Sequence, residues 1–318
     1  MTELIWDGKY VDGKRQSPVR VALPFQTIET VNESAQDRLR TLELFAAGRE
    51  TEWRNRLIWG DKKYVLPSLL PEFAGKVNLI YIDPPFDTGA DFSFTAIIPK
   101  AQGGAEQVAF LKEPSILEQK AYRDTWGHGL DSYLLWFYET LLLLRELLAE
   151  DGSIYVHLDW HVGHYAKAVV DEVFGSGALV GQDSPGFRNE IAWCYSGGGI
   201  PQREFPRKHD TIFWYTKGSS WVFNPQYRPY SPGTVERGRT AVKGPDAELR
   251  SEGTPVNDWW PDVKKITSPT DFEKVYFDTQ KSEELLTRII KTSTREPTNE
   301  SDIVLDCFVG SGTTAAVA

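Results

Sequence analysis

The sequence predicts an α/β protein built on a largely parallel sheet. Two apolar runs, residues 77–82 and 153–158, have the length and the β-branched and aromatic content of buried strands. Stretches with helical spacing of apolar residues alternate with them, and a late strand leads through a glycine-rich turn into another helix. This alternation is typical of βαβ units, in which the helices cover the faces of the sheet.

The first half of the chain supplies most of the predicted elements. A short strand is expected at 56–61, ending in Gly60-Asp61, and a helix with a proline interruption at 62–73. Residues 131–152 place leucines on one helical face, and Gly152 gives a C-terminal stop signal. The strand at 153–158 precedes a helix that ends at Phe174. Aromatic-rich runs then predict strands at 190–195 and 211–217.

The end of the chain repeats the strand and helix pattern. Residues 279–293 place Leu285, Leu286 and Ile289 on one face of an amphipathic helix. Residues 303–305 are the last predicted strand, and a helix is predicted to begin at Thr313 after a turn rich in glycine.

Length and composition are those of a globular protein of the reducing cytosol. With 318 residues and 41% apolar content, the chain has room for one large domain or a domain with an insertion. Two cysteines, Cys194 and Cys307, are too few for a disulfide framework. We found no secretion-signal pattern at the start and no apolar run long enough to span a membrane, so a cytoplasmic protein without a membrane partner is expected.

Charge is distributed unevenly along the chain. The whole chain has a net charge of −10 and a pI near 5.1, which argues against a protein coated in basic patches. Residues 196–271 are rich in Gly, Pro, Arg, Trp and Tyr, and residues 201–250 hold nine Lys or Arg against five Asp or Glu. Basic residues interleaved with aromatics favour a module that contacts phosphates and bases, and a long solvated excursion is the alternative. The candidate phosphate ligands of such a module are Arg203, Arg207 and Lys208.

The strand at 77–82 ends in an unusual group, Asp83-Pro84-Pro85-Phe86. Two consecutive prolines fix φ at both positions and remove both N–H donors, so only acceptors remain beside the aromatic ring. A strand-ending turn with a capping aspartate explains the same residues without any chemistry. The pattern alone leaves both interpretations open.

The second motif is the turn "DCFVGSGTT" at 306–314. Gly310 and Gly312 allow close backbone approach, and Thr313 and Thr314 can cap the following helix, so free N–H groups can face an anionic group. The turn is not a Walker loop, because no lysine follows the glycines. It lacks the third glycine of the dinucleotide fingerprint, although an NAD or nucleotide site would also fit such a turn.

Taken together, the two motifs identify a family. "IDPPF" at a strand end, followed by "TQK" at 279–281 and then "LDCFVGSGTT", resembles the permuted, beta-class amino-methyltransferases that modify exocyclic nitrogens in DNA. "RLIWGD" and "NLIYIDPPFDTG" are most similar to modification subunits of type III restriction–modification systems. The resemblance runs in order from about Arg54 to the end of the chain.

The resemblance implies a Rossmann-like methyltransferase fold with circularly permuted motifs. It places the catalytic domain at 50–195 and 272–318, a target recognition insertion at 196–271 and an N-terminal extension at 1–49. The substrate would be double-stranded DNA, while a restriction nuclease subunit and a homodimer remain open as partners. It also implies C-terminal truncation, because "GTTAAVA" stops inside a helix. The strand at 303–305 is then expected to pair only on the side of 77–82.

The resemblance also implies the cofactor and its ligands. S-Adenosylmethionine would lie across the glycine-rich turn, near the backbone of residues 308–312. Two departures from the family pattern, Cys307 and Ser282 in place of prolines, lie beside the expected site. The implied cofactor residues are Asp61, Thr279, Lys281, Asp306, Phe308, Gly310, Gly312, Thr313 and Thr314.

The implied chemistry is methylation of adenine N6. Asp83 and the Pro84 carbonyl would accept the two amino hydrogens, Pro85 would keep the segment rigid, and Phe86 would stack on a base swung out of the duplex. Related enzymes that carry Asp at the first position of this motif mostly act on adenine. Methylation of cytosine N4 is one alternative, and a catalytically silent DNA-binding component of a restriction complex is another. We expect no metal site, because no Cys or carboxylate set completes a ligand group with His157, His161 and His164.

Overall fold

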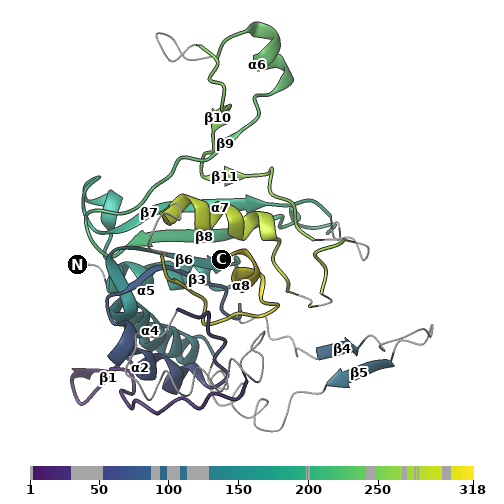
Figure 1. Cartoon of the computed structure of the whole chain (residues 1–318). Coiled ribbons are helices and arrows are strands. Elements are labelled where there is room, and N and C mark those ends of the chain that lie inside the picture. Colours follow the sequence, from purple (N-terminus) through teal and green to yellow (C-terminus); the bar gives the residue numbers. More distant parts are fainter. Residues whose placement is uncertain are drawn as a thin grey trace.

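A computed structural model of the chain shows one central sheet with helices on both faces (Figure 1). It describes residues 3–29, 53–86, 94–98, 108–112, 129–197, 199, 201–240, 248–266, 271–275, 277, 279–295 and 302–318, and of 94–98 and 108–112 only the backbone. The helices are α2 (Lys62–Phe73), α4 (Leu130–Leu147), α5 (Gly163–Phe174), a 3-10 turn η1 (Gly177–Leu179), α6 (Pro232–Arg237), α7 (Glu283–Ser293) and α8 (Thr313–Val317).

The central sheet has the strand order β11-β7-β8-β6-β3-β12. Only β8 runs antiparallel to its neighbours, β6 and β7, while the β3–β6, β3–β12 and β7–β11 pairs are parallel. The sheet strands are β3 (Val77–Ile82), β6 (Leu148–Leu158), β7 (Gly186–Cys194), β8 (His209–Thr216), β11 (Trp259–Trp260) and β12 (Val304–Leu305). The antiparallel two-stranded pairs are β1 (Tyr10–Val11) with β2 (Lys14–Arg15), β4 (Phe94–Ile98) with β5 (Val108–Lys112), and β9 (Tyr227–Arg228) with β10 (Thr254–Pro255).

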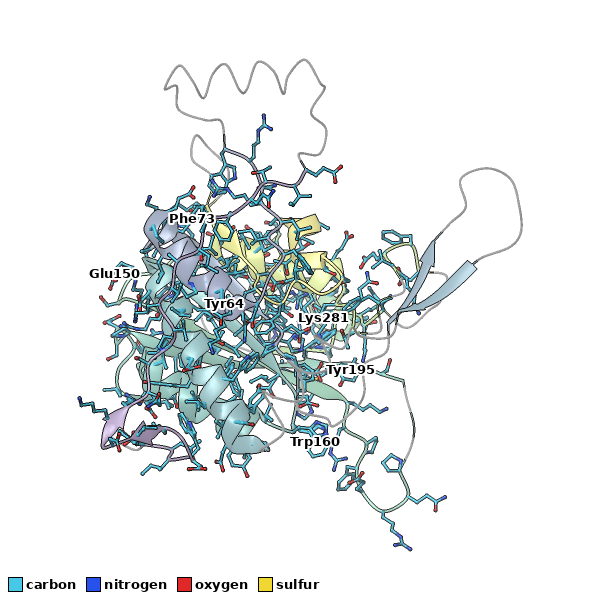
Figure 2. The ribbon with its side chains drawn as sticks, turned by 90° about the horizontal axis from the view of Figure 1, so that it is seen from below. Tyr64, Phe73, Glu150, Trp160, Tyr195 and Lys281 are labelled. Carbon is cyan, nitrogen blue, oxygen red and sulfur yellow. The ribbon has the colours of Figure 1, made fainter. Side chains whose placement is uncertain are left out.

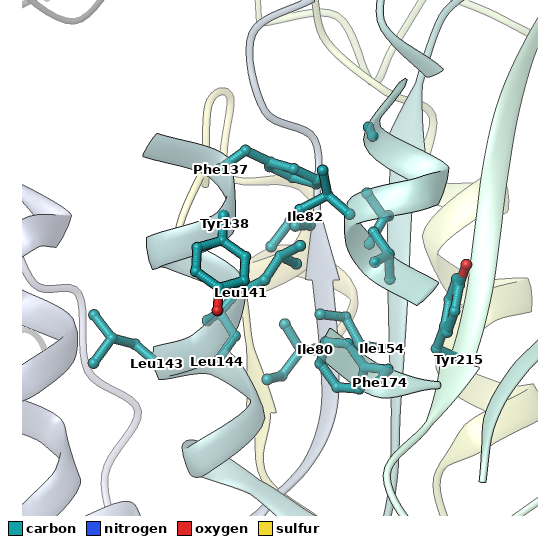
Figure 3. Close-up of a cluster of buried hydrophobic side chains, with 14 of the residues drawn as sticks. Ile80, Ile82, Phe137, Tyr138, Leu141, Leu143, Leu144, Ile154, Phe174 and Tyr215 are labelled. Atoms are coloured by element: carbon teal, nitrogen blue, oxygen red, sulfur yellow. The ribbon is translucent and has the colours of Figure 1, made fainter. Parts of the chain in front are cut away.

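Alternating side chains of β3 point to the two faces of the sheet, as the period of a strand requires. Ile80 and Ile82 pack with α4 and α5, whereas Leu79 and Tyr81 pack with α7 on the other face. Figure 3 shows Ile80 and Ile82 of β3 beside the buried side chains of α4. Burial of each such side chain contributes roughly 1.5–3 kcal/mol to stability. Burial on both faces therefore holds the sheet between its two layers of helices.

Most predicted elements are present at or near the expected residues. The helix at 62–73 is α2, the strand at 77–82 is β3, and the helix predicted to begin at Thr313 is α8. The predicted edge position of 303–305 agrees with the structure, because within the described residues β12 pairs with β3 alone.

The predicted end of one helix was wrong. The helix predicted at 131–152 ends at Leu147, and β6 begins at Leu148, because Leu148 is extended, buried and paired with Val77. Gly152 therefore lies inside a strand, where a Cβ would come within 2.8 Å of the Leu148 side chain.

The strand predicted at 56–61 was also wrong. In the described part of the chain, residues 53–60 join no ladder, and the side chain of Asp61 instead accepts the Lys63 N–H and caps α2 at 2.9 Å. An extended apolar segment becomes a strand only when a sheet edge pairs with it. Leu57 and Trp59 stay exposed here.

The predicted insertion, 196–271, is not wholly separate from the sheet. Strand β8 lies within it and occupies the middle of the sheet, and β11 pairs with β7. The part that projects away from the sheet carries β9, α6 and β10 (Figure 1).

The N-terminal segment packs on the helical layer. Trp6 is buried and meets Tyr138 of α4 edge-on, with ring centroids 5.7 Å apart. Lys9 is fully buried, donates to Glu172 of α5 at 2.7 Å, and has a pKa lowered by its burial. Residues 3–15 are therefore part of the folded body.

Candidate functional site

The candidate site lies along the carboxyl edge of the sheet, where ligands of open α/β sheets bind. Because β3, β6, β7 and β12 run in the same direction, the residues that follow them gather at one edge. These are Asp83 after β3, Asp159 after β6, Tyr195 after β7 and Asp306 after β12. In Figure 2, Lys281, Tyr195 and Trp160 follow one another along this side of the molecule.

Asp83 has one occupied and one open carboxylate oxygen. Its Oδ2 accepts a hydrogen bond from Lys281 Nζ at 2.5 Å. Its Oδ1 is buried and has no hydrogen-bond partner among the described residues. Pro84 is buried, and Phe86 is half-buried, with Lys281 Nζ 5.5 Å from its ring centroid. The Asp-Pro-Pro-Phe segment thus presents an unsatisfied acceptor next to an aromatic face.

The glycine-rich turn is organised by Asp306. Its Oδ1 accepts the Phe308 N–H at 2.8 Å, and its Oδ2 accepts the Thr314 hydroxyl at 2.6 Å. Burial is the main cause that raises the pKa of Asp306 to about 6, and the charge of Asp83 adds to the increase. Both glycines of the turn, Gly310 and Gly312, have positive φ values of 51° and 86°, which favour glycine over other residues.

Helix α2 reaches the same turn from the side. Lys62 Nζ lies 3.7 Å from the Trp136 ring centroid and 5.8 Å from that of Phe308. Burial lowers the pKa of Lys62 to about 8. Asp61, the preceding residue, is exposed and caps α2. The turn is therefore bordered by a cation from the start of α2.

The structure separates the residues of the "TQK" motif. Thr279 is exposed, while Lys281 points into the site and contacts Asp83. The backbone of Lys281 is tied to the glycine-rich turn, because its carbonyl accepts the Thr313 hydroxyl at 3.0 Å. Lys281 therefore connects the two motifs that the sequence places far apart.

A buried polar network beneath Phe86 was missed by the sequence analysis. His157 is fully buried on β6, with its Nδ1 2.8 Å from the Tyr81 hydroxyl and its Nε2 3.2 Å from Asp210 Oδ2. The Tyr195 hydroxyl donates to the other oxygen of Asp210 at 2.9 Å. The Phe86 and His157 ring centroids are 6.1 Å apart. The available signal was a histidine inside an otherwise apolar strand run.

This network holds Asp210 as a carboxylate. Burial opposes the charge, but hydrogen bonds from His157 and Tyr195 and the charge of Lys281 lower the pKa of Asp210 overall. Burial also raises the pKa of Tyr81 and Tyr195 above their ordinary values. No set of three His, Cys, Asp or Glu side chains in the described part of the chain is arranged to hold a metal ion.

The three predicted DNA contacts lie on the loop between β7 and β8, at the same edge as Asp83. Arg203 is exposed, whereas Arg207 pairs with Glu204 at 2.8 Å and lies 4.1 Å from the Trp160 ring centroid. Lys208 Nζ donates to the carbonyls of Gly197 and Gly199 within the loop. The structure brings these residues to the site but gives them different surroundings.

A family model described as DNA methylase matches residues 77–318, more than half of the chain. The chain belongs to this DNA methylase family. The matched region contains both the Asp-Pro-Pro-Phe segment and the glycine-rich turn, and the mostly parallel sheet with helices on both faces is the Rossmann-like methyltransferase fold. Within the described residues, no helix is long and apolar enough to cross a bilayer.

The named relatives of the chain include subunits of type III restriction–modification enzymes and a type II methyltransferase. The chain is 31% identical over 177 residues to the type III EcoP15I Mod subunit of Escherichia coli, and this alignment covers 53% of this chain and 26% of that subunit. It is 25% identical over 328 residues to the StyLTI Mod subunit of Salmonella typhimurium, covering 82% of this chain and 49% of that subunit. A type II methyltransferase of Enterobacter cloacae, M.EcaI, is 28% identical over 204 residues, covering 64% of this chain and 35% of the enzyme. The matches thus span less than half the length of each relative.

Among solved structures, the M1.HpyAVI–SAM complex matches with a TM-score of 0.42 and 19% identity, covering 80% of this chain and 81% of that one. The cytosine-N4-specific PvuII DNA methyltransferase matches with a TM-score of 0.44 and 17% identity, covering 80% of this chain and 75% of that one.

Proposed function

We propose that the site transfers a methyl group from S-adenosylmethionine to the N6 amino group of adenine in double-stranded DNA. The observation that carries this proposal is that Asp83 Oδ1 is buried and has no hydrogen-bond partner among the described residues. A buried carboxylate oxygen without a partner is costly, and the cost is removed when a ligand donates a hydrogen bond to it. An exocyclic amino group has the N–H donors that such an acceptor requires.

The residues around the glycine-rich turn suit this donor. S-Adenosylmethionine carries a sulfonium and an ammonium, and the carboxylate of Asp306 supplies negative charge beside the turn. Apart from its neighbours in the chain, no described residue has an atom within 4 Å of a Cβ built on Gly312, so there is space beside this glycine. The residues that we propose to hold it are Asp61, Thr279, Asp306, Phe308, Gly310, Gly312, Thr313 and Thr314. Lys281 lies between this group and Asp83.

The chemistry divides between donor and protein. When bound, S-adenosylmethionine supplies an electrophilic methyl group whose bond to sulfur breaks as the new nitrogen–carbon bond forms. Asp83 Oδ1 accepts one amino hydrogen and the Pro84 carbonyl the other, so the nitrogen lone pair is directed away from the ring plane. Asp83 then accepts the proton that the nitrogen must lose and releases it to water. Phe86 stacks on the base, which has to leave the duplex to reach the site.

The relatives suggest the setting of this reaction. Two of them are named Mod subunits of type III restriction–modification enzymes, so we infer that the protein acts in such a system with a nuclease subunit as partner. A homodimer and the use of residues 196–271 for target recognition are part of the same proposal.

The test is transfer of a tritiated methyl group from S-adenosylmethionine to double-stranded DNA, followed by separation of the modified bases. We expect N6-methyladenine from the parent and a loss of at least a hundredfold in rate for Asp83→Asn. Asp12→Asn, an exposed aspartate in the N-terminal hairpin, is the matched control and should keep parental activity. Label in N4-methylcytosine would identify the other amino group as substrate. DNA binding without any transfer would identify a silent component.

A further inference from the structure

Lys281 occupies an unusual place for a residue expected to bind the cofactor. It lies 198 residues from Asp83 in the chain, yet its Nζ is 2.5 Å from Asp83 Oδ2. Both side chains are mostly buried, with 12% and 17% of their side-chain surfaces exposed. An ion pair that is largely removed from water is stable only when its geometry is good, because the attraction between the charges must offset the desolvation of each.

The lysine itself is firmly placed by its surroundings. Its carbonyl accepts the Thr313 hydroxyl at the start of α8, and the next residue, Ser282, is the N-cap position of α7. Its ammonium lies 5.5 Å from the Phe86 ring centroid, within the range of a cation–π contact. Two helices and one aromatic ring therefore define where the positive charge can be.

The result is an asymmetric carboxylate. Lys281 saturates Oδ2, and Oδ1 is buried and unpaired within the described part of the chain. A carboxylate with two free oxygens could rotate and offer either one to a donor. Here the ion pair fixes the plane of the carboxylate, because rotation about the Cβ–Cγ bond out of this orientation would break a charge-assisted hydrogen bond. A half turn only exchanges two equivalent oxygens, so one oxygen always faces Lys281 and the other always occupies the open position of Oδ1.

We propose that Lys281 is a positioning residue that orients Asp83, so that Oδ1 is the oxygen that accepts the amino hydrogen of the target base. This inference rests on the proposed function and adds to it a role for Lys281 that is exercised through Asp83. Lys281 balances the charge of the carboxylate and fixes its orientation. Through the Thr313 hydrogen bond it also links that orientation to the glycine-rich turn, where the cofactor is proposed to lie.

A positioning role separates turnover from binding. Lys281→Met keeps the length and apolar stem of the side chain but removes the ammonium. We expect kcat for methyl transfer to fall at least tenfold, while the Kd for S-adenosylmethionine and the KM for DNA change less than about threefold. Lys281→Arg, which restores a donor for the carboxylate, should recover part of kcat. Lys291→Met, an exposed lysine on α7, is the matched control and should behave as the parent.

A double variant tests whether the effect passes through Asp83. If it does, Lys281→Met combined with Asp83→Asn should have the same single-turnover rate as Asp83→Asn alone, since the target of the positioning is already lost. Rates that multiply would show an independent role and overturn the inference.

Other outcomes identify which statement fails. A rise of tenfold or more in the Kd for S-adenosylmethionine with unchanged kcat would make Lys281 a cofactor ligand. A parental kcat in Lys281→Met would leave the proposed function intact but overturn the positioning role. A parent that transfers no methyl group would overturn the proposed function and this inference with it.

Discussion

Asp306 and Asp83 are neighbouring carboxylates with opposite hydrogen-bond states. Asp306 has a donor on each oxygen, whereas Asp83 has one on Oδ2 and none on Oδ1 among the described residues. Two such groups in one site are suited to different tasks. The saturated carboxylate can hold a charge in place, and the unsaturated one can receive a new donor.

The raised pKa of Asp306 predicts a pH-dependent cofactor affinity. The pKa is about 6, so the carboxyl is largely neutral at pH 5 and largely ionised at pH 7. If the cationic cofactor lies beside it, the ionised form binds more tightly, and affinity should rise as pH increases through 6. We expect the Kd for S-adenosylmethionine to be roughly tenfold weaker at pH 5 than at pH 7, which is the change in the ionised fraction. Titration calorimetry across this range provides the measurement.

Asp306→Asn is the control for this profile. It keeps an acceptor for the Thr314 hydroxyl but cannot ionise, so its Kd should be weak and nearly constant from pH 5 to 7. A parental Kd that does not vary over this range would place the cationic groups of the cofactor away from Asp306.

At the scale of elements, the sequence pattern predicted the helices and strands that are determined by their own residues. The apolar run of β3 and the helical spacing of α7 were recognised because their own residues bury the correct faces. The end of α4 was not, since Leu148 leaves the helix to pair with Val77, a contact across the sheet. The segment 56–61 has a strand pattern without a ladder partner in the described chain.

The same distinction applies to the site. Asp83, Asp306 and the two glycines were predicted because each belongs to a contiguous motif. The Lys281–Asp83 pair joins distant positions, and the bond between His157 and Asp210 depends on how β6 and β8 align. No spacing rule encodes such contacts, which become visible only after the sheet is assembled.

The loop between β7 and β8 yields a prediction that distinguishes its basic residues. Arg203 is exposed and pairs with no carboxylate in the described residues, so it is free to meet a phosphate. Arg203→Gln should weaken DNA binding and reduce the slope of log Kd against log salt by about one. Fluorescence anisotropy of labelled duplex DNA at several salt concentrations measures both quantities.

Lys208→Gln serves as the comparison within the same loop. The ammonium of Lys208 is already bonded to the carbonyls of Gly197 and Gly199, so its removal should loosen the loop and leave the salt slope close to the parental value. Equal slopes for the parent and Arg203→Gln would move the DNA surface elsewhere.

At the scale of the whole molecule, the N-terminal segment and the helical layer share one core. Trp6 is 4% exposed and packs with Tyr138, and Lys9 is bonded to Glu172 on a second helix. These contacts join the start of the chain to α4 and α5, and those helices cover the face of β3 that leads to Asp83. A segment without a motif can thus support the site from a distance.

This arrangement predicts that Trp6 contributes to the stability of the entire fold. Trp6→Ala should lower the free energy of unfolding by about 3–5 kcal/mol, because it empties a buried aromatic position. Trp59→Ala is the matched control, since Trp59 is 97% exposed and its loss should change the value by less than about 0.5 kcal/mol. Urea unfolding followed by far-UV circular dichroism gives both numbers. A parental midpoint for Trp6→Ala, or a separate early transition that involves only a small part of the signal, would mean that residues 3–15 unfold independently of the sheet.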